Sequence, residues 1–248
     1  MADQVVTSFS PAGAQLYGRR MVQTYLAHWP ETTPLVVYLD ARLKPSLPVE
    51  TRWTSTLADW AGCLTRWAPY PSLHGRSTPE RPLSKPYKYQ HDVARFAVKL
   101  FVMRDAAVRL ARGVLTWLDG DTVTTRSVPA GFTTALLGDA DVAYLGRGSM
   151  HPETGYLGFR IPEALPLLDW CCETYMSDRV LAITTGWTDC HVIREGLAAV
   201  PVKARDLTGQ HYTGRSHIWP VSPLAPYVTH YKGRSKREAD RKRAGGTR

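Results

Sequence analysis

The sequence predicts an α/β protein with one mostly parallel central sheet and helices on both faces. Two runs, residues 35–40 (LVVYLD) and 114–119 (VLTWLD), are almost entirely apolar, as in strands that are buried on both faces. A stretch with helical spacing precedes each of them, and a short β-prone run at residues 5–10 opens the chain. Because alternating strands and helices are typical of parallel sheets, we expect a single domain of this class.

The individual elements follow from spacing and from turn residues. Residues 12–29 have apolar side chains near helical spacing until Pro30 ends the pattern. Residues 91–111 form a longer helical pattern that Gly113 ends, and residues 141–146 (DVAYLG) predict a short strand. A further helix is expected at residues 163–176.

Other parts of the chain give weaker signals. Residues 41–88 are rich in Pro and Trp and predict irregular structure or short helices. Residues 153–159 (ETGYLGF) are punctuated by glycine, and a stretch rich in His, Pro and aromatic residues precedes YVTHYKGR near the end.

The composition is that of a globular protein, with 44% hydrophobic and 21% charged residues. No run of about 18 apolar residues exists, and the first 30 residues lack the apolar centre of a secretion signal. We therefore expect a cytoplasmic protein without a membrane span. The four cysteines lack CxxC pairs and the Cys/His clusters of a zinc site, which favours a reducing compartment. They are Cys63, Cys171, Cys172 and Cys190.

Positive charge is concentrated at the end of the chain. The formal net charge is +9, and residues 232–248 supply +6 of it, with eight Lys and Arg against Glu238 and Asp240. We therefore divide the chain into a domain at residues 1–234 and a basic tail at residues 235–248. Such a tail is either a solvated end or a contact to nucleic-acid phosphates.

Two carboxylates follow the second buried strand directly. Asp119 and Asp121 flank Gly120 and lie on the same side of an extended chain, at the edge of the sheet where α/β proteins bind ligands. Paired carboxylate oxygens suit Mg²⁺ or Mn²⁺ that bridges a diphosphate. The alternative is an ordinary Asp-Gly turn with two solvated acids.

Four segments together resemble GT-A nucleotide-sugar glycosyltransferases, and in particular the small glycosyltransferases of bacteriophages. They are VVTSF at residues 5–9, a helix that carries Arg95 and Lys99, LTWLDGDT at residues 115–122, and HYKG at residues 230–233. The likeness spans residues 5–234, its specific part is the D-x-D motif with its strand, and residues 41–88 have no counterpart in it.

The resemblance implies a divalent metal and a UDP-sugar donor. It assigns the metal to Asp119, Asp121 and His230, with Asp119 also near the donor, and places Lys232 on the diphosphate. A neutral imidazole can complete a site that has two carboxylates. The alternative for His230 is a surface histidine before a basic tail.

The resemblance also implies further contacts to the donor. Arg95 and Lys99 are i and i+4 on one helix and either contact the phosphates or sugar or form a solvated helix face. The nucleotide is expected near the ends of the first two strands, where core packing is the alternative for the aromatic side chains. The residues concerned are Thr7, Ser8, Phe9, Tyr17 and Asp40.

Two acids are candidates for the chemical step. Asp189, in WTDCHVI, is the first choice as general base or stabilising acid, and Glu153, in the segment that matches an acceptor-side loop, is the second. An inverting transferase needs a carboxylate about 3 Å from the attacking hydroxyl. For either residue, helix capping or a surface salt bridge is the alternative.

The expected activity is transfer of a hexose, with glucose favoured, from a UDP-sugar to a hydroxyl group. The resemblance to phage proteins, together with a pI near 9.5, favours DNA that carries hydroxymethylated pyrimidines as the acceptor. The modified base could be flipped out of the base stack to reach the active site. We expect a monomer in the cytoplasm of an infected bacterial host. The alternatives are transfer to a protein or cell-surface glycan, a nucleic-acid-binding protein without enzymatic activity, and a metal-dependent nuclease.

Overall fold

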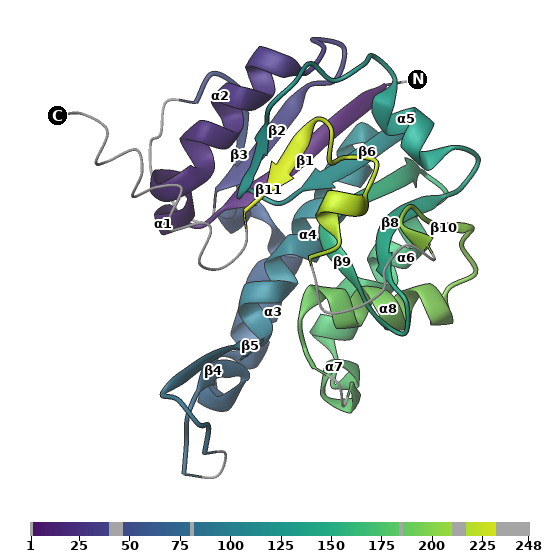
Figure 1. Ribbon diagram of the computed structural model, residues 1–248. Coiled ribbons are helices and arrows are strands. Elements are labelled where there is room, and N and C mark those ends of the chain that lie inside the picture. The colour runs from purple at the N-terminus through teal and green to yellow at the C-terminus, as the bar shows by residue number, and fades with distance from the viewer. Residues whose placement is uncertain (1, 40–46, 80–81, 184–185, 210–216, 232–248) are drawn as a thin grey trace, which may run out of the picture.

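The centre of the molecule is a seven-stranded sheet, seen in Figure 1. The computed structural model describes residues 2–39, 47–79, 82–183, 186–209 and 217–231. The strand order is β10-β8-β9-β6-β1-β2-β3, and only β9 runs against its neighbours. The mostly parallel α/β sheet that the sequence predicts is therefore confirmed. The strands are β1 (Asp3–Phe9), β2 (Leu35–Leu39), β3 (Glu50–Trp53), β6 (Gly113–Leu118), β8 (Val142–Arg147), β9 (Met150–Ile161) and β10 (Ala204–Asp206).

Helices cover both faces of this sheet. Alternate strand residues face opposite cores, so that Val6 and Val36 pack with one set of helices and Val5 and Val37 with the other. The first set comprises α3 (Ala58–Trp67), α4 (Val93–Leu110), α6 (Leu165–Met176) and α8 (Asp189–Ala199), with α7 (Arg179–Ala182) beside them. The second comprises α2 (Arg19–His28), which follows α1 (Pro11–Gly13) and the π-turn Ala14–Gly18, and α5 (Phe132–Leu137).

Helix α4 has clear start and stop signals. The Asp92 carboxylate accepts a hydrogen bond from the backbone N–H of Arg95 and thereby caps the first turn. Gly113, just beyond the end, has φ +141°, and a Cβ there would lie 1.9 Å from the carbonyl oxygen of Ala2. Only glycine fits this position, which lets the chain turn directly from α4 into β6.

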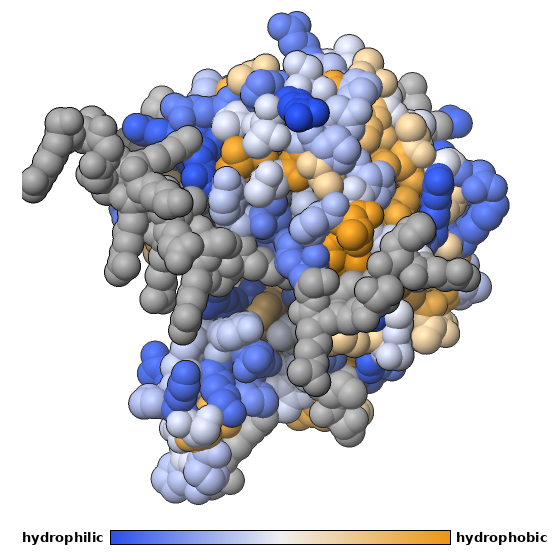
Figure 2. All heavy atoms as spheres, viewed as in Figure 1, coloured by the Kyte–Doolittle hydropathy of each residue, from blue (hydrophilic) through white to orange (hydrophobic). Residues whose placement is uncertain are grey.

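The described part of residues 41–88 has more regular structure than the sequence predicts. Strand β3 extends the central sheet beside β2, and α3 packs on α4. The 3₁₀ turn Thr54–Thr56 joins β3 to α3, and the 3₁₀ turn Pro71–Leu73 follows α3. Strands β4 (His74–Arg76) and β5 (Tyr87–Asp92) form a hairpin that extends away from the sheet in Figure 1. Figure 2 shows a mainly hydrophilic surface there. The strand β3 escapes sequence analysis because it is half exposed at the sheet edge and gains its structure from pairing with β2.

The glycine-punctuated segment is a strand, which corrects the expectation that residues 153–159 form an acceptor-side loop. Strand β9 pairs with both β6 and β8, and Leu157 lies opposite Trp117 on one side and Tyr144 on the other. Gly155 and Gly158 sit where other side chains approach the backbone: a Cβ would lie 2.6 Å from His230 and 2.9 Å from Tyr156. Glycine inside this strand therefore marks close packing and not a turn.

The C-terminal part of the described chain returns to the centre of the molecule. Strand β11 (Val228–His230) follows the 3₁₀ turn Trp219–Val221 and pairs antiparallel with β7 (Thr122–Thr124), the short strand after β6. In Figure 1, β11 lies in front of β1 and β6. His230 is in register with Thr122, which places its side chain beside the D-x-D motif. Among the described residues, no helix is long and apolar enough to cross a membrane.

Candidate active site

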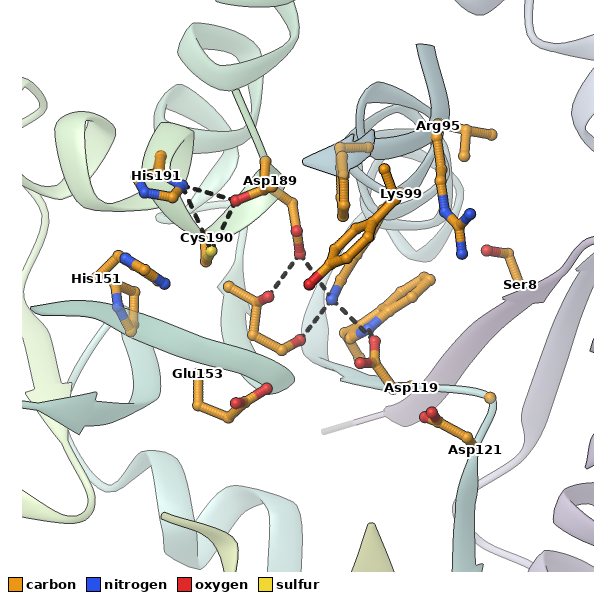
Figure 3. Close-up of a pocket in the computed structure, with 18 of the residues that line it drawn as sticks. Ser8, Arg95, Lys99, Asp119, Asp121, His151, Glu153, Asp189, Cys190 and His191 are labelled. Carbon is orange, nitrogen blue, oxygen red and sulfur yellow. Dashed lines mark hydrogen bonds and ion pairs between the residues drawn. The ribbon is translucent and has the colours of Figure 1, made fainter. Parts of the chain in front are cut away.

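A pocket of about 470 Å³ opens at the carboxyl ends of β1 and β6, between these strands, α4, β9 and the start of α8. Its size is within the range of small-molecule sites, and its position is the edge where parallel sheets bind ligands. Figure 3 shows Asp119 and Asp121 on one side of the pocket, Lys99 and Asp189 near its centre, and His151, Cys190 and His191 on the far side. The pocket thus joins residues that are far apart in the sequence.

Asp119, Asp121 and His230 form a group whose donor atoms all lie within 4.8 Å of one another. The Nε2 atom of His230 is 3.0 Å from the Asp121 carboxylate and 3.6 Å from that of Asp119. Two carboxylates and one imidazole form a donor set that suits Mn²⁺ or Mg²⁺. Only 1% of the His230 side chain is exposed, so the surface histidine considered above is wrong.

Two glycines leave room for the close packing around this group. Gly155 on β9 leaves room for the His230 ring, which would otherwise collide with a Cβ at 2.6 Å. Gly120 lies against Phe9, since a Cβ there would be 2.4 Å from the Phe9 ring. Phe9 therefore packs beneath the D-x-D turn, and this core contact fixes where Asp119 and Asp121 leave the end of β6.

Lys99 lies between two carboxylates. Its ammonium group is 2.9 Å from both the Asp119 and the Asp189 carboxylate and donates to the backbone carbonyl of Thr154 at 2.6 Å. Trp117 places its indole ring 5.0 Å from the same ammonium and donates from Nε1 to Asp119 at 2.8 Å. All three protons of the ammonium group thus have acceptors, and the hypothesis of a solvated helix face does not describe Lys99.

The charges of this cluster shift the pKa values of its members. Burial by itself would raise the pKa of Asp119, but the positive charge of Lys99, assisted by His230 and by hydrogen bonds from Lys99 and Trp117, holds it well below its usual range. Burial would lower the pKa of Lys99, yet the two carboxylates raise it above its usual value. Lys99 and Asp119 are therefore a charged pair at every physiological pH.

The two candidate acids lie on the same side of the pocket but have different partners. Asp189 is the first residue of α8, is 5% exposed, and accepts a hydrogen bond from the Thr154 hydroxyl at 2.5 Å in addition to its pair with Lys99. Glu153 on β9 is 4% exposed, accepts from the backbone N–H of Gly155 and lies 3.9 Å from Arg147. Neither acid is in a surface salt bridge, and Thr188 occupies the N-cap position of α8.

The other predicted donor contacts are distributed unevenly. Ser8, Tyr17 and Arg95 line the pocket with the cluster just described. Thr7 and Phe9 are fully or almost fully buried in the sheet and do not line it, so core packing describes Phe9. Asp40 and Lys232 lie outside the described residues.

Sequence analysis missed several pocket residues. Trp117 is two residues before Asp119 and hence on the same side of β6, a spacing that could have identified it. Arg147 and Thr154 come from the β8–β9 hairpin, whose position depends on strand pairing. The expectation that the cysteines have no Cys/His cluster is wrong, because the fold brings His151 to within 4.8 Å of the donor atoms of Cys190 and His191.

The comparisons with known proteins found similarity in the fold and none in the sequence. No family model and no curated protein matches the sequence. The solved apo structure of mouse xyloside xylosyltransferase 1 superposes with a TM-score of 0.55 at 9% identity, over 94% of this chain and 98% of its own. A glycosyltransferase involved in the glycosylation of the major capsid of PBCV-1 gives a TM-score of 0.51 at 12% identity, over 98% of both chains. In its fold, this chain is a single-domain, GT-A-like α/β protein similar to these glycosyltransferases.

Proposed function

We propose that this protein is a metal-dependent glycosyltransferase that moves a sugar from a UDP-sugar to a hydroxyl acceptor. The observation that carries the proposal is the group formed by Asp119, Asp121 and His230 at the carboxyl edge of a GT-A-like sheet. A nucleic-acid-binding protein without enzymatic activity would have no need for this arrangement in a pocket. The fold likeness favours a transferase over a nuclease.

The charge of the pocket supports a role for a divalent cation. Four carboxylates line it, those of Asp119, Asp121, Glu153 and Asp189. The cations that line it are Lys99, which is paired with Asp119 and Asp189, Arg147, which lies 3.9 Å from Glu153, and Arg95. Beside the D-x-D motif, a diphosphate would be repelled by Asp119 and Asp121 unless a further cation offset their charge. Mn²⁺ or Mg²⁺ bound by Asp119, Asp121 and His230 supplies that positive charge to the donor diphosphate.

The donor is proposed to lie across the ends of β1 and β6. The nucleotide would contact Ser8 and Tyr17, and Arg95 at the pocket rim would face the phosphates or sugar. Asp40 and Lys232 are retained as proposed contacts to the base and the diphosphate, on the strength of the sequence pattern. Lys99 is assigned a different task, which is to hold Asp119 and Asp189 in place.

For the chemical step we propose Asp189 as the general base, with Glu153 as the second candidate. The carboxylate takes the proton of the acceptor hydroxyl while the acceptor oxygen bonds to the anomeric carbon. The bond from that carbon to the diphosphate breaks, and UDP leaves with the electron pair. Asp189 lies on the other side of the Lys99 ammonium from Asp119, as Figure 3 shows, and the pocket that both acids line would hold the sugar.

As acceptor we propose a hydroxymethylated pyrimidine in DNA, and as donor sugar glucose. The support is the charge of residues 232–248, which supply +6 of the net +9 and begin two residues after His230. The second candidate acceptor is a glycan or a protein, and the similar structures favour it: one protein is named for transfer to a xyloside, the other for glycosylation of a viral capsid.

A donor screen tests the proposal. Purified full-length protein is incubated with UDP-glucose and other UDP-sugars, with Mn²⁺ or EDTA, and release of UDP is measured without any acceptor. The same mixtures then receive hydroxymethylated DNA, unmodified DNA or a model glycoside, and the products are identified by mass spectrometry. We expect Mn²⁺-dependent release of UDP from at least one sugar and a mass gain on one acceptor.

The variant Asp121→Asn tests the metal role, because it keeps the size of the side chain and removes a charged ligand. It should abolish Mn²⁺-dependent UDP binding. UDP affinity that is equal in Mn²⁺ and EDTA would contradict the metal role. An absence of UDP release with every UDP-sugar, in a folded protein, would contradict the donor class.

A further inference from the structure

A second group of potential metal ligands lies on the opposite side of the pocket from the D-x-D motif. One donor atom each from His151, Cys190 and His191 lie within 4.8 Å of one another, and Cys190 Sγ is 3.7 Å from His191 Nδ1. A tetrahedral zinc site with bonds of about 2.0 to 2.3 Å places its ligand atoms about 3.4 to 3.6 Å apart. The distance of 3.7 Å between Cys190 Sγ and His191 Nδ1 is close to this spacing.

Neighbouring groups hold these side chains in position. The Thr188 hydroxyl lies 2.8 Å from Cys190 Sγ, in the place of an outer-shell partner of the sulfur. It is also 2.7 Å from His191 Nδ1, a contact that a metal bound to this nitrogen would replace. Gly186 lies against the His191 ring, where a Cβ would be 2.8 Å from Cε1. The rings of His151 and His191 are 4.1 Å apart. Figure 3 shows the labelled members of this group together, away from Asp119 and Asp121.

The two imidazoles of the group are in the neutral form that binds a metal, whereas a metal would have to displace the proton of the thiol. Burial, together with Arg147 and His191, lowers the pKa of His151 to about 4, and burial lowers that of His191 as well, so both imidazoles are neutral at pH 7. Burial raises the pKa of Cys190 to about 12, so the thiol loses its proton only when a cation binds the sulfur.

The nearby fixed charges are nearly balanced. Arg147 donates to the backbone carbonyls of His151 and Pro152, and Arg194 is paired with Glu195 at 2.7 Å. Glu153 and Asp189 supply negative charge beside the group. A thiolate formed at Cys190 would add one more negative charge, which favours a divalent cation there.

We propose that His151, Cys190 and His191 bind a Zn²⁺ ion, separate from the ion at Asp119, Asp121 and His230. One sulfur and two imidazole nitrogens are the ligands that zinc prefers, whereas the carboxylate-rich group suits harder ions. The zinc joins β9 to the first turn of α8. Glu153 follows His151 by two residues and Asp189 directly precedes Cys190, so the ion fixes the backbone that carries both candidate acids.

Titration with Co²⁺ tests this site in the full-length protein, with no sugar present, so that the outcome is independent of the proposed activity. A cysteine-bound tetrahedral Co²⁺ has a thiolate-to-metal charge-transfer band that a site of oxygen and nitrogen ligands lacks. We expect the band in the wild type, loss of the band on adding Zn²⁺, and no band in Cys190→Ser. Asp121→Asn, which changes only the other group, should keep it.

Zinc affinity and cysteine labelling provide the second readout. Cys190→Ser and His191→Asn should each weaken Zn²⁺ binding by more than about 100-fold, since losing even an outer-shell partner costs about 10- to 100-fold. In the wild type, Zn²⁺ should slow alkylation of Cys190, the one partly exposed cysteine among the four, all of which are described. The proposal is overturned if the wild type shows no band with Co²⁺ or if the band persists in Cys190→Ser. It is also overturned if Asp121→Asn abolishes Zn²⁺ binding while Cys190→Ser retains it.

Discussion

Lys99 determines the charge state of the pocket at the scale of single residues. Its ammonium group lies between the carboxylates of Asp119 and Asp189, and only 12% of its side chain is exposed. The third N–H of the ammonium group donates a hydrogen bond to the Thr154 carbonyl. Buried charges are stable only when they are paired and hydrogen-bonded. Asp119 therefore remains ionised, and the same cation holds both carboxylates in position before any ligand arrives.

Lys99→Met tests this role, because it keeps most of the side-chain length and removes the charge. It leaves two buried carboxylates without their cation, and we expect the free energy of unfolding at pH 7 to fall by about 3 kcal/mol. That is the lower end of the usual range, since 29% of the Asp119 side chain is exposed. Urea unfolding of both proteins measures the difference.

The pH dependence of that difference has a defined sign. The folded-state pKa of Asp119 is lowered, so this carboxylate stabilises the wild type above its unfolded value of about 3.9 and loses the effect as the pH falls toward the folded value. In Lys99→Met, burial raises the same pKa instead. The stability difference should therefore shrink between pH 7 and pH 3, and a constant difference would contradict the assignment.

Asp189→Asn addresses the chemical step. The amide keeps the size of the side chain and can still accept the hydrogen bond from Thr154, but it cannot take a proton. We expect sugar transfer to fall by about 100-fold or more while UDP binding in Mn²⁺ is retained. Single-turnover transfer and UDP titration separate the two effects. Near-normal transfer would assign the base to Glu153, which Glu153→Gln then tests.

Strand β9 organises the site at the scale of whole elements. It separates β6 from β8, presents Glu153 and Thr154 to the pocket, and carries Gly155, against which the His230 ring packs. Strand β11 brings His230 to this place by pairing with β7 directly after the D-x-D turn. His230 is therefore held beside Asp119 and Asp121 by the pairing of β11 with β7 and by its packing against Gly155 of β9.

Gly155→Ala should disrupt this arrangement. A Cβ at 2.6 Å from the buried His230 ring forces the ring or β11 to move, so Mn²⁺ affinity should fall together with stability. Gly158→Ala on the same strand is the matched control: its Cβ meets the Tyr156 hydroxyl at 2.9 Å and should lower stability only. Mn²⁺ titration and thermal unfolding of both variants provide the comparison. Equal Mn²⁺ affinities would contradict the role of Gly155.

At the scale of the whole molecule, the charge of the chain is unevenly divided between the sheet and the end. Residues 235–248 hold six Lys and Arg against Glu238 and Asp240, a net +4. If they contact DNA, each lost phosphate contact lowers the slope of log affinity against log salt by about 0.9. These residues lie outside the described part of the chain.

Deletion of residues 235–248 separates the proposed acceptors. For a DNA acceptor, we expect weaker binding of hydroxymethylated DNA and a smaller salt slope, with Mn²⁺-dependent release of UDP unchanged. The measurement is DNA affinity at several salt concentrations, beside donor hydrolysis. An unchanged salt slope would remove the charge argument for DNA and favour the glycan or protein acceptor that the similar structures suggest.

The sequence by itself determined the fold class and the place of Asp119 and Asp121 at the edge of the sheet. Apolar runs at β2 and β6 identify strands buried on both faces, because burial on two sides removes the alternation of polar and apolar residues. The two acids directly follow β6. They therefore lie at the edge of the sheet where the carboxyl ends of the parallel strands meet. The position of Asp119 and Asp121 in the fold needed no knowledge of tertiary contacts.

Only the tertiary structure decided which distant residues join them. The sequence showed Cys190 beside His191 but not His151, and Lys99 on a helix but not its position between Asp119 and Asp189. Local periodicity reports which side of an element is buried, and it carries no information on which element packs there. The pairing of β9 between β6 and β8, and of β11 with β7, supplied that information, because hydrogen bonding between strands fixes register across any sequence separation.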